Sequence, residues 1–503
     1  MPDPSFHVPS LRARRLLSLL LCFLLFGSSL VTSASAAVVE PSLRLFGPSG
    51  EVTLYRYGRG EPVYMDLGVL VGSIGAPFEL RAQRADYTQA PTLSQILYGP
   101  NDQRQAQPLD PAMLDGWNGL ADFFEVDFAK DGIGIASTTQ SFCPGGWQRE
   151  RIDDSGPDVP VYPPGCYANP FTKGAVWGID EGWAVGTSGG SEPPMLDIPN
   201  GLYSVTMRVA PDYVDALSID AAGSEVTMSV RIRTLRDFEC RRGCMFEESH
   251  PARSAANETR AQAVPVDDAP DPAMLPDLIA LPSWGIDVRN RRIHTALTFG
   301  ATVWNGGAAD LVVEGFRRSD EAVMDAFQYF YDGGEVVGKA PAGELGFDER
   351  HGHDHWHFKQ FAAYSLLDAE GNEVRRSRKE AFCLAPTDSI DLTIPNADWS
   401  PGSIGLTTAC GGESSIWVRE VLSLGWGDTY FQGLPGQSFR ITNLPNGIYF
   451  IKVEANPGGL LHETTADNNV ELREIRIRGR SGSRRVVVPP WNGIDTENIF
   501  GWR

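Results

Sequence analysis

Short stretches in which apolar and polar residues alternate recur along the chain, and the two clearest ones follow an Asn-Gly pair. They span residues 199–211 and 445–457. Asn-Gly supplies the positive φ that a tight turn needs, and the alternation after it is typical of a half-buried β-strand. Both stretches run turn, strand and proline in the same register, which indicates that the chain contains one unit twice.

Other landmarks keep the same order in the two halves. Phe142-Cys143 corresponds to Phe382-Cys383, Cys166 to Cys410, and Gly182-Trp183 to Gly425-Trp426, and each half closes on an alternating strand, 230–233 or 475–478. Short alternating strands, 53 Gly, 36 Pro and no long amphipathic helix predict an all-β protein of two tandem β-sandwich units. We expect these units at 37–244 and 275–479, joined by a polar linker at 245–274 and followed by an unassigned tail at 480–503.

The first 36 residues have the features of a secretory signal peptide. Three arginines precede a short apolar run at 16–26, and Ala34-Ser35-Ala36 is a cleavage signal. The alternative is a permanent membrane anchor, although no later segment reaches the length of a transmembrane helix. We therefore predict a secreted, extracellular protein without membrane attachment after cleavage.

Removal of Asp3 and the three arginines changes the formal net charge from −21 to −23. A strongly acidic surface disfavours nucleic acid as a partner and favours the approach of cationic amines. The simpler alternative is that this charge only keeps an exported protein soluble.

Of seven cysteines, Cys22 leaves with the signal peptide. An even number remains, which predicts disulfides in an exported chain. Six cysteines allow fifteen pairings, but the duplication favours one bond within each unit. We expect Cys143–Cys166 and Cys383–Cys410, with Cys240–Cys244 left as a local loop closure.

Four histidines fall within seven residues, at positions 351, 353, 355 and 357. On a β-strand His353, His355 and His357 project from one face, and three imidazoles so placed can hold one metal ion. Copper is the first choice for nitrogen ligands and zinc is the next. His351 shares this parity and is a candidate fourth ligand, base or hydrogen-bonding neighbour. The alternatives are a solvated polar strand and a pH-sensitive cluster.

Residues 275–479 resemble the catalytic domain of the lysyl oxidase family. The combination of motifs is specific: Leu275-Pro276-Asp277-Leu278, the alternating histidines, residues 364–369, Lys379-Glu380-Ala381-Phe382-Cys383-Leu384, Asp428-Thr429-Tyr430, residues 447–453, Asn456-Pro457 and Asn468-Asn469-Val470. The resemblance implies copper held by His353, His355 and His357. We interpret the chain as a secreted bacterial member.

The resemblance also implies a lysine tyrosylquinone made from Lys379 and Tyr430, a pair that composition and spacing would not select. This cofactor, with molecular oxygen, converts a primary amine to an aldehyde and releases hydrogen peroxide and ammonia. A free amine and peptidyl-lysine are both candidate substrates. Asp428 and His351 are two candidates for the base that removes the α-proton.

A calcium site is the family's other implied feature. The matching residues are Asp277, Leu278 through its backbone carbonyl, Glu463, Asn468 and Asn469, and oxygen ligands of this kind suit calcium. Thr465 replaces an aspartate of the family pattern, with Asp467 close by. The cysteines that animal members carry next to the histidines and soon after Phe-Cys are also absent here.

In the first half, Thr139 and Thr187 stand where the second half has Lys379 and Tyr430, and no histidine lies between His7 and His250. We therefore expect a non-catalytic copy that packs on the active half or binds a surface. Two other functions stay open for the whole chain. One is a non-enzymatic extracellular copper-binding β-sandwich protein, and the other is a purely structural extracellular protein.

Overall fold

The computed structural model describes residues 38–503 except 59, 101–102, 167–168, 189–193, 236–269, 292–293, 350–353, 378, 380, 402–405, 495 and 498–503. The predicted signal peptide, most of the predicted linker, Cys240 and Cys244 lie outside the described residues. Strands dominate the described part, whose one α-helix is the short α1 (Pro211–Ala216). The all-β prediction is therefore confirmed. None of the helices in this part is long and apolar enough to cross a lipid bilayer.

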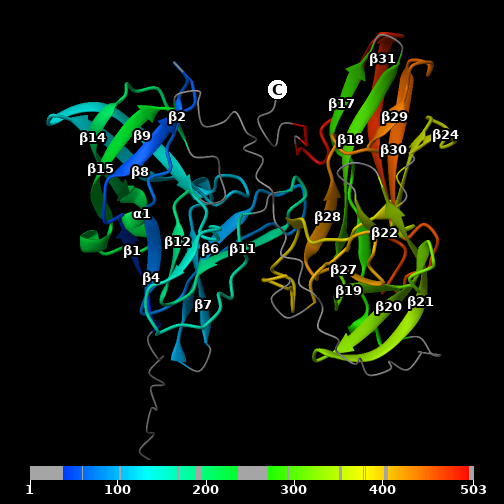
Figure 1. Cartoon of the computed structure of the whole chain (residues 1–503), viewed down its shortest axis with the longest axis horizontal. Helices are drawn as coiled ribbons and strands as arrows, with labels where there is room; N and C mark the ends of the chain where they lie inside the picture. Colours follow the sequence, from blue (N-terminus) through cyan, green and yellow to red (C-terminus); the bar gives the residue numbers. More distant parts are fainter. Residues whose placement is uncertain are drawn as a thin grey trace, which may run out of the picture. The chain divides into compact units, whose positions relative to one another are not determined.

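A five-stranded sheet in the first half is built around the first Asn-Gly turn (Figure 1). Its strand order is β2 (Val52–Arg56), β15 (Glu225–Thr234), β14 (Gly201–Val209), β8 (Leu120–Lys130) and β9 (Ile133–Phe142). Gly201 pairs with Ile232, and the Tyr203 hydroxyl donates to the Pro199 carbonyl at 2.7 Å. Alternate side chains of β14 are buried, as its sequence predicts.

Apart from one edge strand, a second five-stranded sheet repeats this arrangement around the second Asn-Gly turn. β2 is parallel to its neighbour β15, whereas the corresponding edge strand of the second sheet is antiparallel to its neighbour. Its order is β24 (Glu373–Arg376), β23 (Ala362–Leu367), β30 (Gly447–Ala455), β31 (Val470–Arg480) and β32 (Ser483–Val487). Gly447 pairs with Ile477, and the Tyr449 hydroxyl donates to the Pro445 carbonyl at 2.9 Å. The matching registers support the interpretation of the chain as a duplicated unit.

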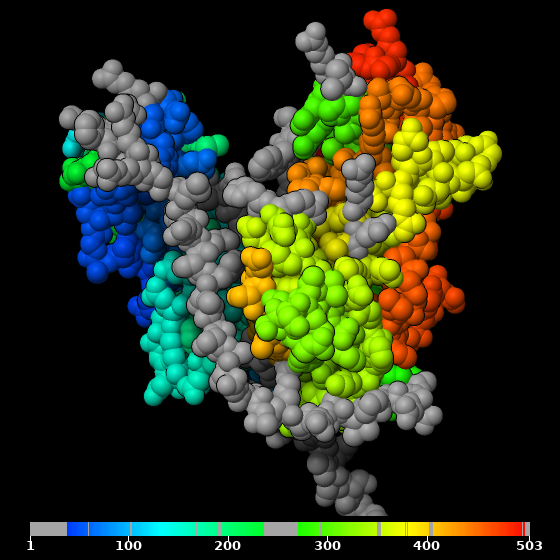
Figure 2. All heavy atoms as spheres, turned by 45° about the vertical axis from the view of Figure 1, so that its right-hand side comes forward, coloured from blue at the N-terminus to red at the C-terminus, as the bar shows by residue number. Residues whose placement is uncertain are grey.

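Two further sheets in the second half position the candidate site. The first contains β16 (Leu278–Ala280), β18 (Thr295–Asn305), β28 (Trp426–Tyr430) and β26 (Asp388–Ser389) along its main path. The second runs β25 (Ala381–Phe382), β22 (His355–Lys359), β21 (Glu335–Asp348), β20 (Val323–Asp332), β19 (Leu311–Phe316) and β27 (Trp417–Leu422). The paired strands β20 and β21 reach the surface as the lime-green atoms of Figure 2.

Side chains from several sheets meet in a large buried apolar cluster in each half, as sheet-on-sheet packing requires. The cluster of the second half also includes Tyr162 and Val176 of the first half. The segment predicted as a tail is partly structured, because β32 extends the sheet of β31. Farther along it, the Trp491 ring lies 4.9 Å from the ring of Tyr87 and 5.2 Å from that of Phe171. Two residues of the first half therefore contact this segment.

Two of the three predicted disulfides are confirmed, and the third, Cys240–Cys244, lies outside the described residues. Cys143 bonds to Cys166, and Cys383 bonds to Cys410. The partners are 23 and 27 residues apart, so each bond closes a loop of similar size. The second bond also borders the candidate site, because the Cys383 carbonyl accepts the Tyr430 hydroxyl.

Replacing Cys383 and Cys410 together by alanine should lower the free energy of unfolding by about 3 kcal/mol, because the loop is then open in the unfolded chain. The Cys143→Ala/Cys166→Ala variant should lose a similar amount. Urea unfolding followed by circular dichroism measures both losses. An unchanged unfolding midpoint in either double variant would contradict a stabilising role for that bond.

Candidate active site

Lys379, which precedes a strand of one sheet, and Tyr430, which belongs to another sheet, lie against each other. Lys379 comes just before β25, and Tyr430 is the last residue of β28, where it pairs with Ala301 of β18. The Lys379 ammonium nitrogen lies 4.3 Å from the centroid of the Tyr430 ring and 4.8 Å from that of Phe382. The structure therefore places together the two side chains that sequence spacing alone would not have selected.

Lys379 is nearly closed to water, whereas Tyr430 is partly exposed. Lys379 is 3% exposed, and its ammonium donates to the Ala381 carbonyl at 3.2 Å. The Phe382 ring packs edge-on against the Tyr430 ring, with centroids 4.9 Å apart. The Tyr430 hydroxyl donates to the Cys383 carbonyl at 3.1 Å. Burial, with the nearby carboxyl groups of Asp428 and Glu420, raises the pKa of Tyr430 well above its usual value.

Two buried carboxyl groups accompany the pair. Burial is the main cause that raises the pKa of Asp428 well above its usual value; the Lys379 ammonium opposes this shift, and Asp388 adds to it. Burial likewise raises the pKa of Glu420. The Glu420 Oε2 atom accepts a hydrogen bond from the Leu384 amide at 3.0 Å. Asp428 Oδ2 and Glu420 Oε1 have no hydrogen-bond partner among the described atoms.

Sequence reasoning selected Asp428 and missed Glu420. A signal for Glu420 did exist in β27, where burial alternates over residues 417–420. Glu420 has the same parity as Val418 and Leu422, and all three are fully buried. A carboxyl group on the apolar face of a strand is costly to bury, which makes it a candidate for function.

Strand β22, which carries His355 and His357, is paired with β25 next to this site. Phe358 of β22 pairs with Phe382 of β25, so the strand that carries the histidines adjoins the strand that follows Lys379. His355 is partly buried and His357 is 2% exposed, and their ring centroids lie 4.5 Å apart. His351 and His353 lie outside the described residues.

The opposite face of β22 belongs to the core. Trp356 is buried, and its indole nitrogen donates to the Gly412 carbonyl at 2.9 Å. His357 Nδ1 lies 3.5 Å from a carboxylate oxygen of Asp348, the kind of neighbour that orients a ligating imidazole.

Two adjacent imidazoles on one face of a strand suit copper or another first-row transition metal. Across the described residues, no group of three or more His, Cys, Asp or Glu side chains is arranged for a metal, and the third predicted ligand, His353, is not among them.

The residues predicted for calcium lie together beside β16. The Asn468 amide donates to Asp277 at 2.9 Å, and the Asn469 amide donates to Glu463 at 2.8 Å. The Leu278 amide donates to Glu463 at 3.2 Å. The buried side-chain oxygens Asp277 Oδ1, Asn468 Oδ1 and Asn469 Oδ1 have no hydrogen-bond partner within the described structure. Such oxygens fit the hard-cation donor set that calcium prefers.

The first half has threonines at the two matched positions. Thr139 lies on β9, where its hydroxyl donates to Asp122 at 2.5 Å, and Thr187 follows β12 (Trp183–Gly186). Neither side chain offers an amine or an aromatic ring, so this pair cannot form a lysine–tyrosine cross-link.

A family model described as lysyl oxidase matches residues 340–486. These residues are therefore similar to a lysyl oxidase domain. The matched segment includes the four clustered histidines, Lys379, Tyr430 and residues 463–469. It begins after Asp277 and Leu278 and does not reach the first half.

Individual lysyl oxidases are also similar in sequence to this chain. Protein-lysine 6-oxidase from Rattus norvegicus is 33% identical over 129 residues, which are 25% of this chain and 28% of the rat protein. The Sus scrofa protein of that name is also 33% identical over 129 residues, 45% of its length. Lysyl oxidase homolog 2 from Gallus gallus is 28% identical over 136 residues, 27% of this chain and 15% of the relative. The chain thus spans less than half of each of these relatives, and its bacterial origin stays a prediction.

Calcium should stabilise the protein if the oxygens around Asp277 bind it. Calcium at one hundred times its dissociation constant should raise the free energy of unfolding of chelator-treated protein by about 2.7 kcal/mol. Asp277→Ala should abolish this gain, whereas Asp287→Asn, at an exposed position of β17 (Trp284–Asn290), should keep it. Calorimetry with and without calcium measures the effect. Equal melting temperatures for the wild type in both conditions would rule the site out.

Proposed function

We propose that the protein is a secreted copper-dependent amine oxidase whose organic cofactor is a lysine tyrosylquinone formed by Lys379 and Tyr430. It would convert a primary amine, oxygen and water to an aldehyde, ammonia and hydrogen peroxide. The observation that carries the proposal is the 4.3 Å approach of the Lys379 ammonium to the face of the Tyr430 ring. This approach occurs inside a lysyl oxidase domain and beside the strand of His355 and His357.

The proposed roles follow from the surroundings of each group. His353, His355 and His357 would hold copper, which supplies the oxidation of the Tyr430 ring with oxygen. Phe382 packs against that ring and keeps water away. The Asp428 carboxylate, next to Lys379, would accept the proton that leaves the substrate carbon. Its raised pKa makes it a stronger proton acceptor than an ordinary aspartate.

Two features bear on the substrate. The formal net charge of −21 attracts cationic amines. The relatives named protein-lysine 6-oxidase point to a lysine side chain within a polypeptide, so we propose peptidyl-lysine as the first substrate to test. Disulfides in both halves suit an exported protein.

The second candidate function is a non-enzymatic extracellular copper-binding module. Such a module would need the histidines but neither Lys379 nor Tyr430. The burial of Lys379 against the Tyr430 ring favours the oxidase, because a lysine without a functional role is normally exposed.

Lys379→Met and Tyr430→Phe should each reduce peroxide release to background while leaving copper content almost unchanged, because each removes one partner of the cross-link and no proposed copper ligand. His355→Ala should lower both. Peroxide release is measured on copper-loaded protein with lysine-containing peptides and diamines, and copper by elemental analysis.

Matched controls for this series are Lys359→Met and Tyr449→Phe. Lys359 is on the same strand as His355 and pairs with Glu344 at the surface, and the Tyr449 hydroxyl only bonds a turn carbonyl. Both variants should remain active. Full peroxide release from Lys379→Met would refute the proposal.

Asp428→Asn should lower kcat by about 10²- to 10⁴-fold, the range for loss of a general base. In the wild type, kcat/KM should rise with pH through the pKa of Asp428, because only the deprotonated carboxyl accepts a proton. Burial places this rise above the usual aspartate range. Steady-state kinetics across pH should show the rise missing in Asp428→Asn and kept in Glu420→Gln. The reverse pattern would assign the base to Glu420.

A further inference from the structure

A loop of the first half lies along the back of the candidate site. The Lys173 amide donates to the Ile390 carbonyl at 2.6 Å, and the Leu392 amide donates to the Gly174 carbonyl at 2.9 Å. Gly174 and Asp391 thereby form a parallel bridge. Gly174 begins β11 (Gly174–Ile179), which belongs to a sheet of the first half, so the two halves join through backbone hydrogen bonds.

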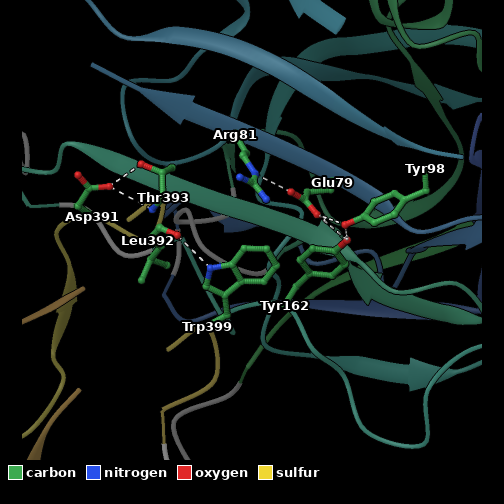
Figure 3. A network of polar contacts seen from close by, with 8 residues as sticks. All are labelled: Glu79, Arg81, Tyr98, Tyr162, Asp391, Leu392, Thr393 and Trp399. Atoms are coloured by element: carbon green, nitrogen blue, oxygen red, sulfur yellow. Dashed lines mark hydrogen bonds and ion pairs between the residues drawn. The ribbon is translucent and has the colours of Figure 1, made fainter. Parts of the chain in front are cut away.

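Gly174 permits this close approach because it has no side chain. A Cβ atom there would lie 2.2 Å from an Asp391 carboxylate oxygen and 2.4 Å from the Thr393 hydroxyl. Asp391 is itself held, since it accepts the Thr393 hydroxyl at 2.6 Å and the Thr393 amide at 3.1 Å (Figure 3). Any larger residue at 174 would have to displace the side chains of Asp391 and Thr393.

Farther along the same contact, the two halves share an aromatic and charged network (Figure 3). The Tyr162 ring stacks on the Trp399 ring at 5.8 Å, and the Arg81 guanidinium lies 5.5 Å from the Trp399 ring centroid. Glu79 is fully buried and accepts both Arg81, at 2.6 Å, and the Tyr162 hydroxyl, at 3.0 Å. Glu79 thus holds Arg81 and Tyr162 of the first half against Trp399 of the second half.

Asn169 extends from this loop to the strand that carries Tyr430. Its side chain is buried, and its amide nitrogen donates to the hydroxyls of Thr302 at 3.1 Å and Thr429 at 3.4 Å. These two hydroxyls are 2.6 Å apart. The amide oxygen of Asn169 accepts the Phe171 amide at 3.0 Å and closes the local turn. One end of the side chain thus shapes its own loop, while the other contacts the second half.

The contact is on the opposite face of β28 from Tyr430. Side chains alternate along a strand, so Asp428 and Tyr430 share one face and Thr429 projects from the other. Asn169 also hydrogen-bonds Asp388, whose pKa is raised to about 6, mainly by burial. Asp388 in turn is one of the groups that raise the pKa of Asp428.

We propose that the first half is a positioning domain for the oxidase. Asn169 and the close approach at Gly174 support the face of β28 that is opposite Tyr430. This support keeps Asp428 and Tyr430 in place beside Lys379. Asn169 is a positioning residue, because it reaches the reacting groups only through Thr429 and Asp388. The inference rests on the proposed oxidase function for its effect on turnover. The support of β28 by the first half does not depend on the oxidase function.

Two variants of the full chain test the inference. Asn169→Ser keeps an oxygen for the local turn but is too short to reach Thr429, and Gly174→Ala displaces the Asp391 and Thr393 side chains at the contact between the two segments. The matched control is Ser400→Ala, which also removes one hydrogen bond between the halves, from the Ser400 hydroxyl to the Val161 carbonyl at 3.0 Å.

The first readout is hydrogen exchange of metal-free protein, measured by mass spectrometry on peptides that cover 387–392 and 426–431. The Thr429 amide donates to the Thr387 hydroxyl at 2.8 Å within this region. Both test variants should exchange roughly tenfold faster there, as the loss of one buried hydrogen bond allows, while Ser400→Ala should match the wild type. This readout needs neither copper nor quinone.

The second readout is steady-state oxidation by the copper-loaded protein. Asn169→Ser should lower kcat roughly tenfold, because the reacting groups lose their alignment, and leave KM unchanged, since the contact is on the face away from the substrate. Wild-type exchange rates at 426–431 in both test variants would overturn the inference, and so would an unchanged kcat in an active protein. If the wild type oxidises no amine, the oxidase proposal fails and the exchange data alone decide the positioning claim.

Discussion

The approach of a buried lysine to the face of a tyrosine ring is the contact on which the site depends. An ammonium group is costly to bury without compensation. Here the Tyr430 and Phe382 rings, the Ala381 carbonyl and the Asp428 charge surround it. The same enclosure raises the pKa of Asp428 and of Tyr430. Two sheets must therefore meet with their polar groups facing inward, and this packing places a reactive amine, a phenol and a carboxyl group together.

The repeated architecture explains how one half can hold this site while the other lacks it. Both halves place an Asn-Gly turn, a central strand and one disulfide in matching positions. The framework is thus shared by both halves. The proposed chemistry would depend on a few differences between them, such as Lys379 in place of Thr139 and Tyr430 in place of Thr187. The first half lacks these residues, but it still contributes Asn169, which hydrogen-bonds Thr429 on the face of β28 opposite Tyr430.

Local patterns in the sequence were sufficient for the class of fold and for both described disulfides. Alternation after Asn446-Gly447 predicts β30 because a half-buried strand needs that pattern. The pairing of Lys379 with Tyr430 required the family resemblance, since they are far apart in the chain and only the packing of two sheets joins them. Glu420 and Asn169 were missed because their roles depend on contacts with distant segments of the chain. Glu420 accepts the Leu384 amide, and Asn169 donates to Thr429.

Peptide mass spectrometry of the copper-loaded, oxygen-exposed protein tests the central claim most directly. The account predicts one proteolytic product in which the peptide of Lys379 is joined to that of Tyr430, with a mass that corresponds to an oxidised tyrosine ring bonded to the lysine nitrogen. Recovery of both peptides separate and unmodified, from protein that has bound copper, would contradict it.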